Sequence, residues 1–171
     1  YNNYTDAHNN LGITLKDLGK TEEAEKSYRK AIEINPLFAD AYLNLCDLLE
    51  KSNKLEELLM IVNLARKNNV VNQNNFLYFE SLAYFRKGKY DCLDEILMNI
   101  DVKKLNHRLV VSYFKLKGDL FNTKGEFNKA FEAYHQMNSH IQMSGEFNEN
   151  VKFNYNLKKR NWFNIGGNAK I

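Results

Sequence analysis

Apolar side chains recur along this chain at separations of three, four and seven residues, and short polar segments interrupt them. The first two such stretches contain Leu11, Leu15, Ala24, Tyr28 and Ala31. Because an α-helix completes a turn every 3.6 residues, this spacing gathers the apolar side chains along one side of each helix. The pattern predicts pairs of amphipathic helices, and the single proline of the chain offers almost no obstacle to them.

The turns between these helices recur at a nearly constant interval. Gly19, Asn53, Gly88 and Gly125 each follow an amphipathic stretch, and their positions are 34, 35 and 37 residues apart. Glycine, and less readily asparagine, adopts the left-handed conformation that ends a helix. Evenly spaced turns of this kind predict a chain built from repeated helical hairpins.

The apolar framework repeats with the turns. The second unit repeats the first after 34 residues, with Leu45, Leu49, Leu58, Val62 and Ala65. Small residues stand where the two helices of a hairpin cross, as Gly12 and Ala24 in the first unit and Gly118 and Ala130 in the last. We therefore expect the same hairpin packing at both ends of the chain.

These residues carry a resemblance to a known family. The set Leu11, Gly12, Leu15, Gly19, Ala24, Tyr28, Ala31 and Pro36 resembles a complete tetratricopeptide repeat. The resemblance implies an all-α fold, a right-handed α-solenoid of about four tetratricopeptide-repeat (TPR) hairpins plus a C-terminal capping helix. The expected units are 5–38, 39–72, 74–105 and 111–144, followed by the capping helix over 145–163 and a tail over 164–171.

Two units depart from the family pattern. Cys46 holds the small crossing position of the second unit, where we interpret it as a small buried hydrophobe. Glu80 falls where the third unit should have an apolar residue, so the register of that unit is the least defined. Asp91 is expected to cap the second helix of the third unit.

In a solenoid of this kind the first helix of each unit lines a concave groove. The side chains expected to point into it, and so to bind a peptide or partner protein, are Asp6, Asn9, Asn10, Ile13, Asp40, Leu43, Asn44, Asp47, Tyr78, Phe79 and Leu82. The acidic residues favour a basic or neutral ligand segment, and the aromatic ones favour an apolar anchor.

Two groove types known from the family can be compared with these residues. Asn10 and Asn44 lie one repeat apart and resemble an asparagine ladder that binds a peptide main chain, although ordinary solvated amides explain them equally well. The carboxylate clamp for acidic chaperone tails finds only Asn44 in place, with Asn9, Ile13, Asn75 and Phe79 at its other positions. We therefore expect no chaperone-tail clamp.

Catalytic and metal sites have no support in the sequence. The four histidines are scattered, and Cys46 and Cys92 have no metal-binding spacing, so both are interpreted as reduced, buried thiols. We expect no enzyme, no catalytic residue, no cofactor and no metal.

The composition of the chain limits the classes of partner that can be expected. A net charge of +3 from 24 basic and 21 acidic residues is too small an excess to indicate nucleic acid. The basic and aromatic residues 152–162 are interpreted as the solvated face of the capping helix. No apolar run approaches the roughly 20 residues of a membrane span, and a cytoplasmic location is expected.

The sequence thus predicts a scaffold that binds a protein or peptide in a concave groove. An alternative comes from a looser similarity to the repeat regions that precede bacterial sulfotransferase domains. It makes the chain a non-catalytic substrate-recognition region of a larger enzyme, because the phosphosulfate-binding loop of such enzymes is absent.

Overall fold

The computed structural model describes residues 2–144, all of whose regular elements are helices. They are α1 (Asn2–Asp17), α2 (Thr21–Ile34), α3 (Ala39–Lys51), α4 (Leu55–Lys67), α5 (Gln73–Arg86), α6 (Leu93–Met98), a 3₁₀ turn η1 (Val102–Lys104), α7 (His107–Thr123) and α8 (Phe127–Ser144). The expected capping helix and tail lie outside the described residues.

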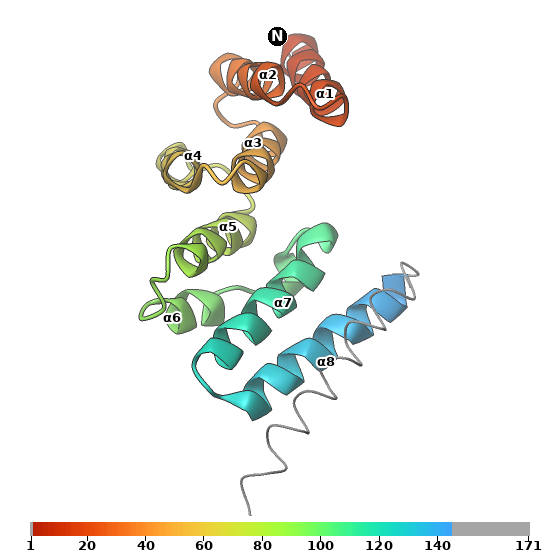
Figure 1. Ribbon diagram of the computed structural model, residues 1–171. Coiled ribbons are helices and arrows are strands. Elements are labelled where there is room, and N and C mark those ends of the chain that lie inside the picture. Colours follow the sequence, from red (N-terminus) through yellow and green to blue (C-terminus); the bar gives the residue numbers. More distant parts are fainter. Residues whose placement is uncertain (1, 145–171) are drawn as a thin grey trace, which may run out of the picture.

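The helices pair as consecutive hairpins. Figure 1 shows α1, α3 and α5 on one side of an arc and α2, α4 and α6 on the other. Each helix packs against its hairpin partner, and α2 and α4 also pack against the first helix of the next hairpin. The predicted all-α fold of stacked helical hairpins is confirmed, while the unit boundaries given above stay predictions.

The left-handed conformation expected of the turn glycines and of Asn53 is confirmed. Gly19, Gly88 and Gly125 have φ values of 75°, 70° and 76°, and Asn53 has a φ of 56°. After each of them the next backbone N–H donates to the carbonyl five residues earlier, at 2.8–2.9 Å. This bond closes the end of the first helix in all four hairpins.

The small crossing residues are also explained by their contacts. A Cβ atom on Gly12 would lie 2.5 Å from the ring of Tyr28, and one on Gly118 would lie 2.5 Å from the ring of Tyr134. The first and fourth hairpins therefore share one packing motif, in which a tyrosine ring lies directly on a glycine. A methyl group at either glycine leaves no room for that ring.

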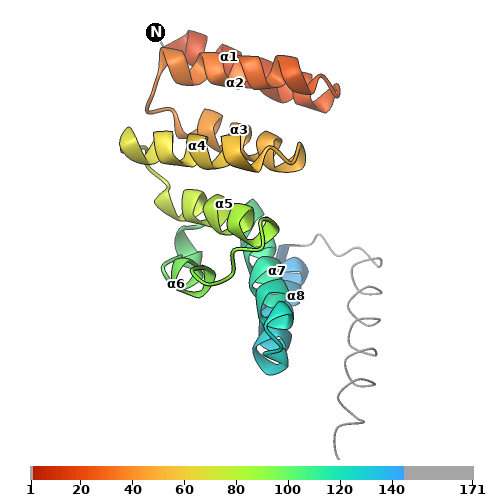
Figure 2. The same cartoon turned by 60° about the vertical axis from the view of Figure 1, so that its left-hand side comes forward.

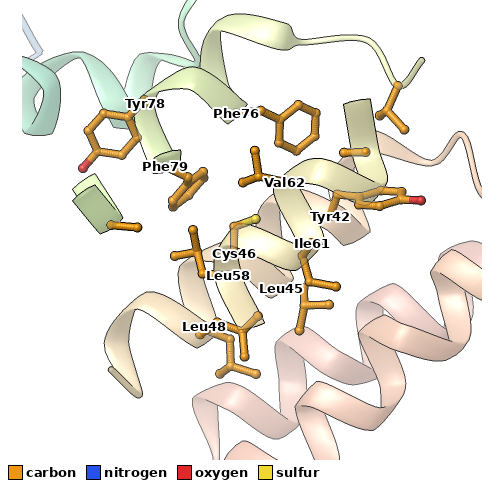
Figure 3. Close-up of a cluster of buried hydrophobic side chains, with 14 of the residues drawn as sticks. Tyr42, Leu45, Cys46, Leu48, Leu58, Ile61, Val62, Phe76, Tyr78 and Phe79 are labelled. Carbon is orange, nitrogen blue, oxygen red and sulfur yellow. The ribbon is translucent and has the colours of Figure 1, made fainter. Parts of the chain in front are cut away.

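Between the first and third hairpins the core is continuous. Figure 3 shows Leu45, Leu48 and Ile61 of the second hairpin pointing toward the first hairpin. Phe76 and Phe79 of α5 cover the opposite side, beside Val62 and Leu58. Cys46 is fully buried in this core, and burial raises the pKa of its thiol, so the expected apolar role is confirmed.

The last hairpin turns away from the stack. Figure 2 shows α7 and α8 running across the direction of α1 to α5. The short α6 precedes this change, and the hydroxyl of Tyr113 on α7 donates to the carbonyl of Leu97 at 3.1 Å. Lys124 adds an ion pair with Asp94 at 2.5 Å. The third and fourth hairpins are thereby joined despite the change in direction.

Three expectations need correction. Cys92 is exposed rather than buried, because it lies in the turn that precedes α6. Asp91 does not cap α6, whose N-cap is Cys92 and has no side-chain capping bond. Leu11 is 47% exposed although it belongs to the apolar framework. Its equivalent Leu45 faces the preceding hairpin, and no hairpin covers Leu11 in the described residues.

The glycine-tyrosine contact gives a first prediction. Gly12→Ala should lower the free energy of unfolding by about 1–3 kcal/mol, because the new methyl group and the Tyr28 ring cannot occupy one space. Urea denaturation followed by circular dichroism measures this loss. The matched control is Ala7→Gly, an exposed position on the same helix, where only helix propensity of about 1 kcal/mol is lost. A stability of Gly12→Ala equal to that of the parent chain would contradict the packing.

Candidate protein-binding face

The first helices α1, α3 and α5 lie along one side of the arc, which we call the inner face. Its residues include most of those expected to line the groove. Their placement follows from the 34-residue interval, because equivalent positions of successive first helices point the same way. In Figure 1 this is the side toward which α7 and α8 extend.

Asparagine side chains connect α1 to α3 on this face. Asn44 Nδ2 donates to Asn9 Oδ1 at 2.9 Å, and Asn9 is almost fully buried. Asn10, the repeat equivalent of Asn44, is exposed beside this pair. The amide of Asn44 therefore has one hydrogen held by Asn9, and its group carries a further hydrogen and an acceptor oxygen. Asn9 was expected to line the groove, but it is buried and accepts from Asn44 instead of facing a ligand. Comparison of equivalent positions alone could not reveal this contact.

Ion pairs connect the same helices farther along. Asp47 accepts from Lys16 of α1 at 3.4 Å and from Lys51 at 3.0 Å. Arg86 of α5 donates to the Glu50 carboxylate and to the Glu50 carbonyl, both at 2.8 Å. Asp47, expected to present a negative charge to a ligand, is thus neutralised by two lysines. In the sequence, these contacts could have been recognised only from oppositely charged residues that lie 31 and 36 positions apart.

Two equivalent carboxylates of this face are accessible. Asp6 and Asp40 are both exposed and stand 34 residues apart on α1 and α3. Asp40 lies in the first turn of α3, where a carboxylate interacts favourably with the positive end of the helix dipole, whereas Asp6 lies farther along α1. Because Asp47 and Glu50 are paired, Asp6 and Asp40 remain turned toward solvent, as does Asp17 at the C-terminal end of α1.

The expected aromatic anchors are not on the surface. Tyr78 is 5% exposed and Phe79 is 4% exposed. Their rings meet edge to face at 5.4 Å, and burial raises the pKa of Tyr78, which is hydrogen-bonded to Ser112 of α7, to about 12. The helix α7 packs against α5 at this point. Both side chains therefore belong to the core, below any surface that a ligand could contact.

The apolar side chains that stay accessible on this face are aliphatic. Ile13 of α1, Leu43 of α3 and Leu82 of α5 are all half-buried. They pack at the edge of the core while leaving part of their surface toward solvent. The face thus combines partly exposed aliphatic side chains, solvent-facing carboxylates and amide groups.

Polar loops secure the third hairpin beside this face. Asn75 Oδ1 accepts from the backbone N–H of Asn106 at 2.8 Å, and Asn74 Oδ1 accepts from that of Asp101 at 2.7 Å. Glu80, which broke the apolar pattern, is mostly buried and pairs with Arg66 of α4 at 2.8 Å. An ion pair therefore occupies the place of the expected apolar contact.

Other kinds of site were also sought over residues 2–144. In that range no three histidine, cysteine, aspartate or glutamate side chains gather in a way that could hold a metal ion. None of the helices described is both long enough and apolar enough to cross a membrane.

Comparison with known proteins agrees with the architecture. Residues 5–38 match the family model of the tetratricopeptide repeat. The crystal structure of MamA superposes with a TM-score of 0.63 over 84% of this chain and 81% of that chain, at 17% sequence identity. No curated protein sequence matches the chain. The likeness to MamA concerns the fold.

The burial of Phe79 gives a second prediction. Phe79→Ala should lower the free energy of unfolding by about 3–5 kcal/mol, because it empties a large volume between α3, α4 and α5. Met60→Ala, at an exposed position of α4, is the control and should change it by less than about 0.5 kcal/mol. Chemical denaturation measures both. Equal, small effects of the two variants would show that Phe79 is a surface residue after all.

Proposed function

Because this chain is a tetratricopeptide-repeat protein, and therefore has the architecture of a protein-interaction scaffold, we propose that it binds a peptide or partner protein on its inner face. The observation that carries the proposal is the composition of that face. Two carboxylates, partly exposed aliphatic side chains and asparagine amides lie on three neighbouring helices whose relative positions are fixed by hydrogen bonds and ion pairs. A rigid surface loses little entropy on binding.

The charges indicate the ligand. Lysines and an arginine already pair with Asp47 and Glu50, so the accessible negative charge in the N-terminal halves of α1 and α3 is that of Asp6 and Asp40, while Asp17 is exposed at the C-terminal end of α1. A ligand with a lysine or arginine beside these carboxylates gains a favourable contact, whereas an acidic segment is repelled. Such complementarity acts mainly on the association rate and on the choice of partner.

The aliphatic residues supply the apolar part of the contact. Ile13 and Leu43 stand on the same helices as Asp6 and Asp40, seven and three residues farther along. A short extended ligand with a basic residue followed by an aliphatic one fits this order. Asn10 and Asn44 contribute amides that can bind the ligand main chain whatever its sequence. All of these residues belong to the set that was expected to line the groove. Tyr78 and Phe79 of that set are not included, because they are buried.

A recognition region within a larger enzyme would use the same inner face. The alternative therefore differs in what is attached to the chain and not in how the chain binds. The variants below test both versions of the proposal.

A third prediction follows for binding. Peptides selected from a random 12-residue library on the intact chain should be enriched in sequences with a lysine or arginine near an aliphatic residue. The double variant Asp6→Asn/Asp40→Asn should bind them about three- to tenfold more weakly, in line with two exposed ion pairs. The loss should shrink at high salt. Fluorescence anisotropy measures the dissociation constants.

The controls separate charge from general effects. Glu22→Gln removes an exposed carboxylate from α2, on the opposite side of the arc, and should leave affinity unchanged. Asn44→Ala should weaken all selected peptides alike, because its amide contacts main chain rather than side chains. Selection of acidic peptides, or an equal loss with Glu22→Gln, would rule out the inner face as the binding surface.

A further inference from the structure

Charge is distributed unevenly along this fold. Residues 2–101, which include α1 to α6, carry 16 acidic and 12 basic side chains, whereas residues 102–144, which form η1, α7 and α8, carry three acidic and seven basic ones. The small net charge of the sequence therefore conceals an acidic stack and a basic last hairpin. Such an asymmetry decides which part of a partner each end of the molecule attracts.

The basic end adjoins the inner face. Ser112 of α7 is hydrogen-bonded to Tyr78 of α5. The charges of Glu50 on α3 and Arg86 on α5 also act on this tyrosine, so all three helices come together here. Figure 1 shows α7 extending from α5 on the side of the arc that α1, α3 and α5 form. The side of α7 that carries Ser112 therefore continues the inner face beyond α5.

Two cations lie on that side of α7. Arg108 precedes Ser112 by four residues and Lys115 follows it by three, and these spacings place the side chains on one side of an α-helix. Both are exposed, and we call them the α7 cations. Lys103 and Lys104, exposed in η1 directly before α7, add to the positive charge at this end of the face.

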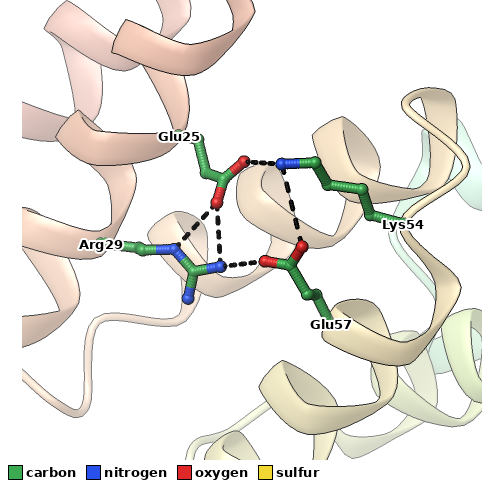
Figure 4. Close-up of polar contacts among 4 residues, drawn as sticks. All are labelled: Glu25, Arg29, Lys54 and Glu57. Carbon is green, nitrogen blue, oxygen red and sulfur yellow. Dashed lines mark hydrogen bonds and ion pairs between the residues drawn. The ribbon is translucent and has the colours of Figure 1, made fainter.

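Charges between the first two hairpins are compensated, in contrast to those of α7. Figure 4 shows Glu25 and Arg29 of α2 interlocked with Lys54 and Glu57 of the second hairpin. Lys54 donates to Glu25 at 2.9 Å, and Arg29 donates to Glu57 at 2.8 Å. Each of the four thus has an oppositely charged partner on the neighbouring hairpin. The side chain of Arg108 forms no ion pair in the part of the chain that the structure describes.

The α7 cations are also poorly compensated by their own helix. Lys115 donates to Asp119 at 2.6 Å, but this carboxylate is shared with the hydroxyl of Tyr134, which donates to it at 2.5 Å. Arg108 lies in the first turn of α7, beside the positive end of the helix dipole, whereas α3 has Asp40 in its first turn. A cation kept at such an unfavourable place is typical of a residue that serves binding.

We propose that the ligand bound by the inner face, as suggested under the proposed function, is bipolar and that an acidic segment of it binds the α7 cations Arg108 and Lys115. Its basic and aliphatic part lies beside Asp6 and Asp40, and the acidic segment lies at the other end. Opposite ends of the ligand then meet opposite charges. This fixes the direction in which the ligand lies, since reversing it places like charges together.

Helix packing sets the separation between the two ends of the ligand. The helix α3 packs against α5, and α5 packs against α7. Because packed helices lie about 8–10 Å apart, Asp40 and Arg108 are separated by roughly 20 Å, which an extended chain spans with about six residues. The acidic residues of the ligand should therefore stand about six positions from the basic ones.

Peptide selection on the intact chain tests this order of charges. The selected peptides should have an aspartate or glutamate about six positions from the lysine or arginine. Arg108→Gln/Lys115→Gln should bind them about three- to tenfold more weakly, in line with two exposed ion pairs. The matched control Lys26→Gln/Lys67→Gln removes two exposed cations from α2 and α4, on the opposite side of the arc, and should leave affinity unchanged. Fluorescence anisotropy measures both.

Charge reversal separates a direct contact from the general field of the last hairpin. In Arg108→Glu, the residue preferred at the acidic position of the ligand should become lysine or arginine. A peptide with lysine at that position should bind Arg108→Glu about threefold or more tightly than the original peptide does. Unchanged preference in this variant would contradict a contact between Arg108 and the ligand.

Two results separate a wrong order of charges from a wrong binding face. Peptides that depend on Asp6 and Asp40 but bind Arg108→Gln/Lys115→Gln as tightly as the parent chain would overturn the bipolar ligand and leave the proposed function standing. The absence of any peptide that depends on Asp6 and Asp40 would overturn both. If the α7 cations instead bind single-stranded RNA, or hold a dimer in sedimentation equilibrium, the acidic peptide segment is replaced by nucleic acid or by a second copy.

Discussion

The contact between one hairpin and the next is the interaction on which the rest of this structure depends. A single hairpin buries only one side of each helix, so most of its apolar surface needs a neighbour. Leu45 and Leu48 supply that contact to the first hairpin, and Phe76 supplies it from the third. The ion pairs of Glu25 and Arg29 then fix the register of the stack. Exposed ion pairs contribute little energy, so the apolar residues provide the stability and the charges the alignment.

The inner face is a consequence of that stacking. Because hairpins repeat at about 34 residues, their first helices are brought side by side, and Asn9 can reach Asn44 while Lys16 reaches Asp47. The same contacts that hold the helices also use up part of their polar surface. What remains accessible at Asp6, Asp40, Ile13 and Leu43 is therefore decided by the stack and not by any one helix.

The local features of this fold could be predicted from the sequence, because they depend on neighbouring residues. The left-handed turns at Gly19 and Asn53 and the small residue at Gly12 are features of this kind. The burial of Tyr78 could not be predicted, because it depends on how α7 packs against α5 after the change in direction. Phe79 is instead buried beside Leu58 on the side of the second hairpin, which the undefined register of the third unit concealed. The partial exposure of Leu11 could not be predicted for a related reason, since periodicity shows which side of a helix is apolar but not which element covers that side.

Native-state hydrogen exchange tests the central claim most directly, because it measures the opening free energy of each helix separately. If neighbouring hairpins stabilise one another, the amides of α3 and α4, which have a hairpin on both sides, should exchange most slowly. Those of α1 and α2, packed on one side only within the described residues, should exchange faster and as one group. Equal protection of α1 and α3 would contradict an account in which stability comes from contacts between successive hairpins.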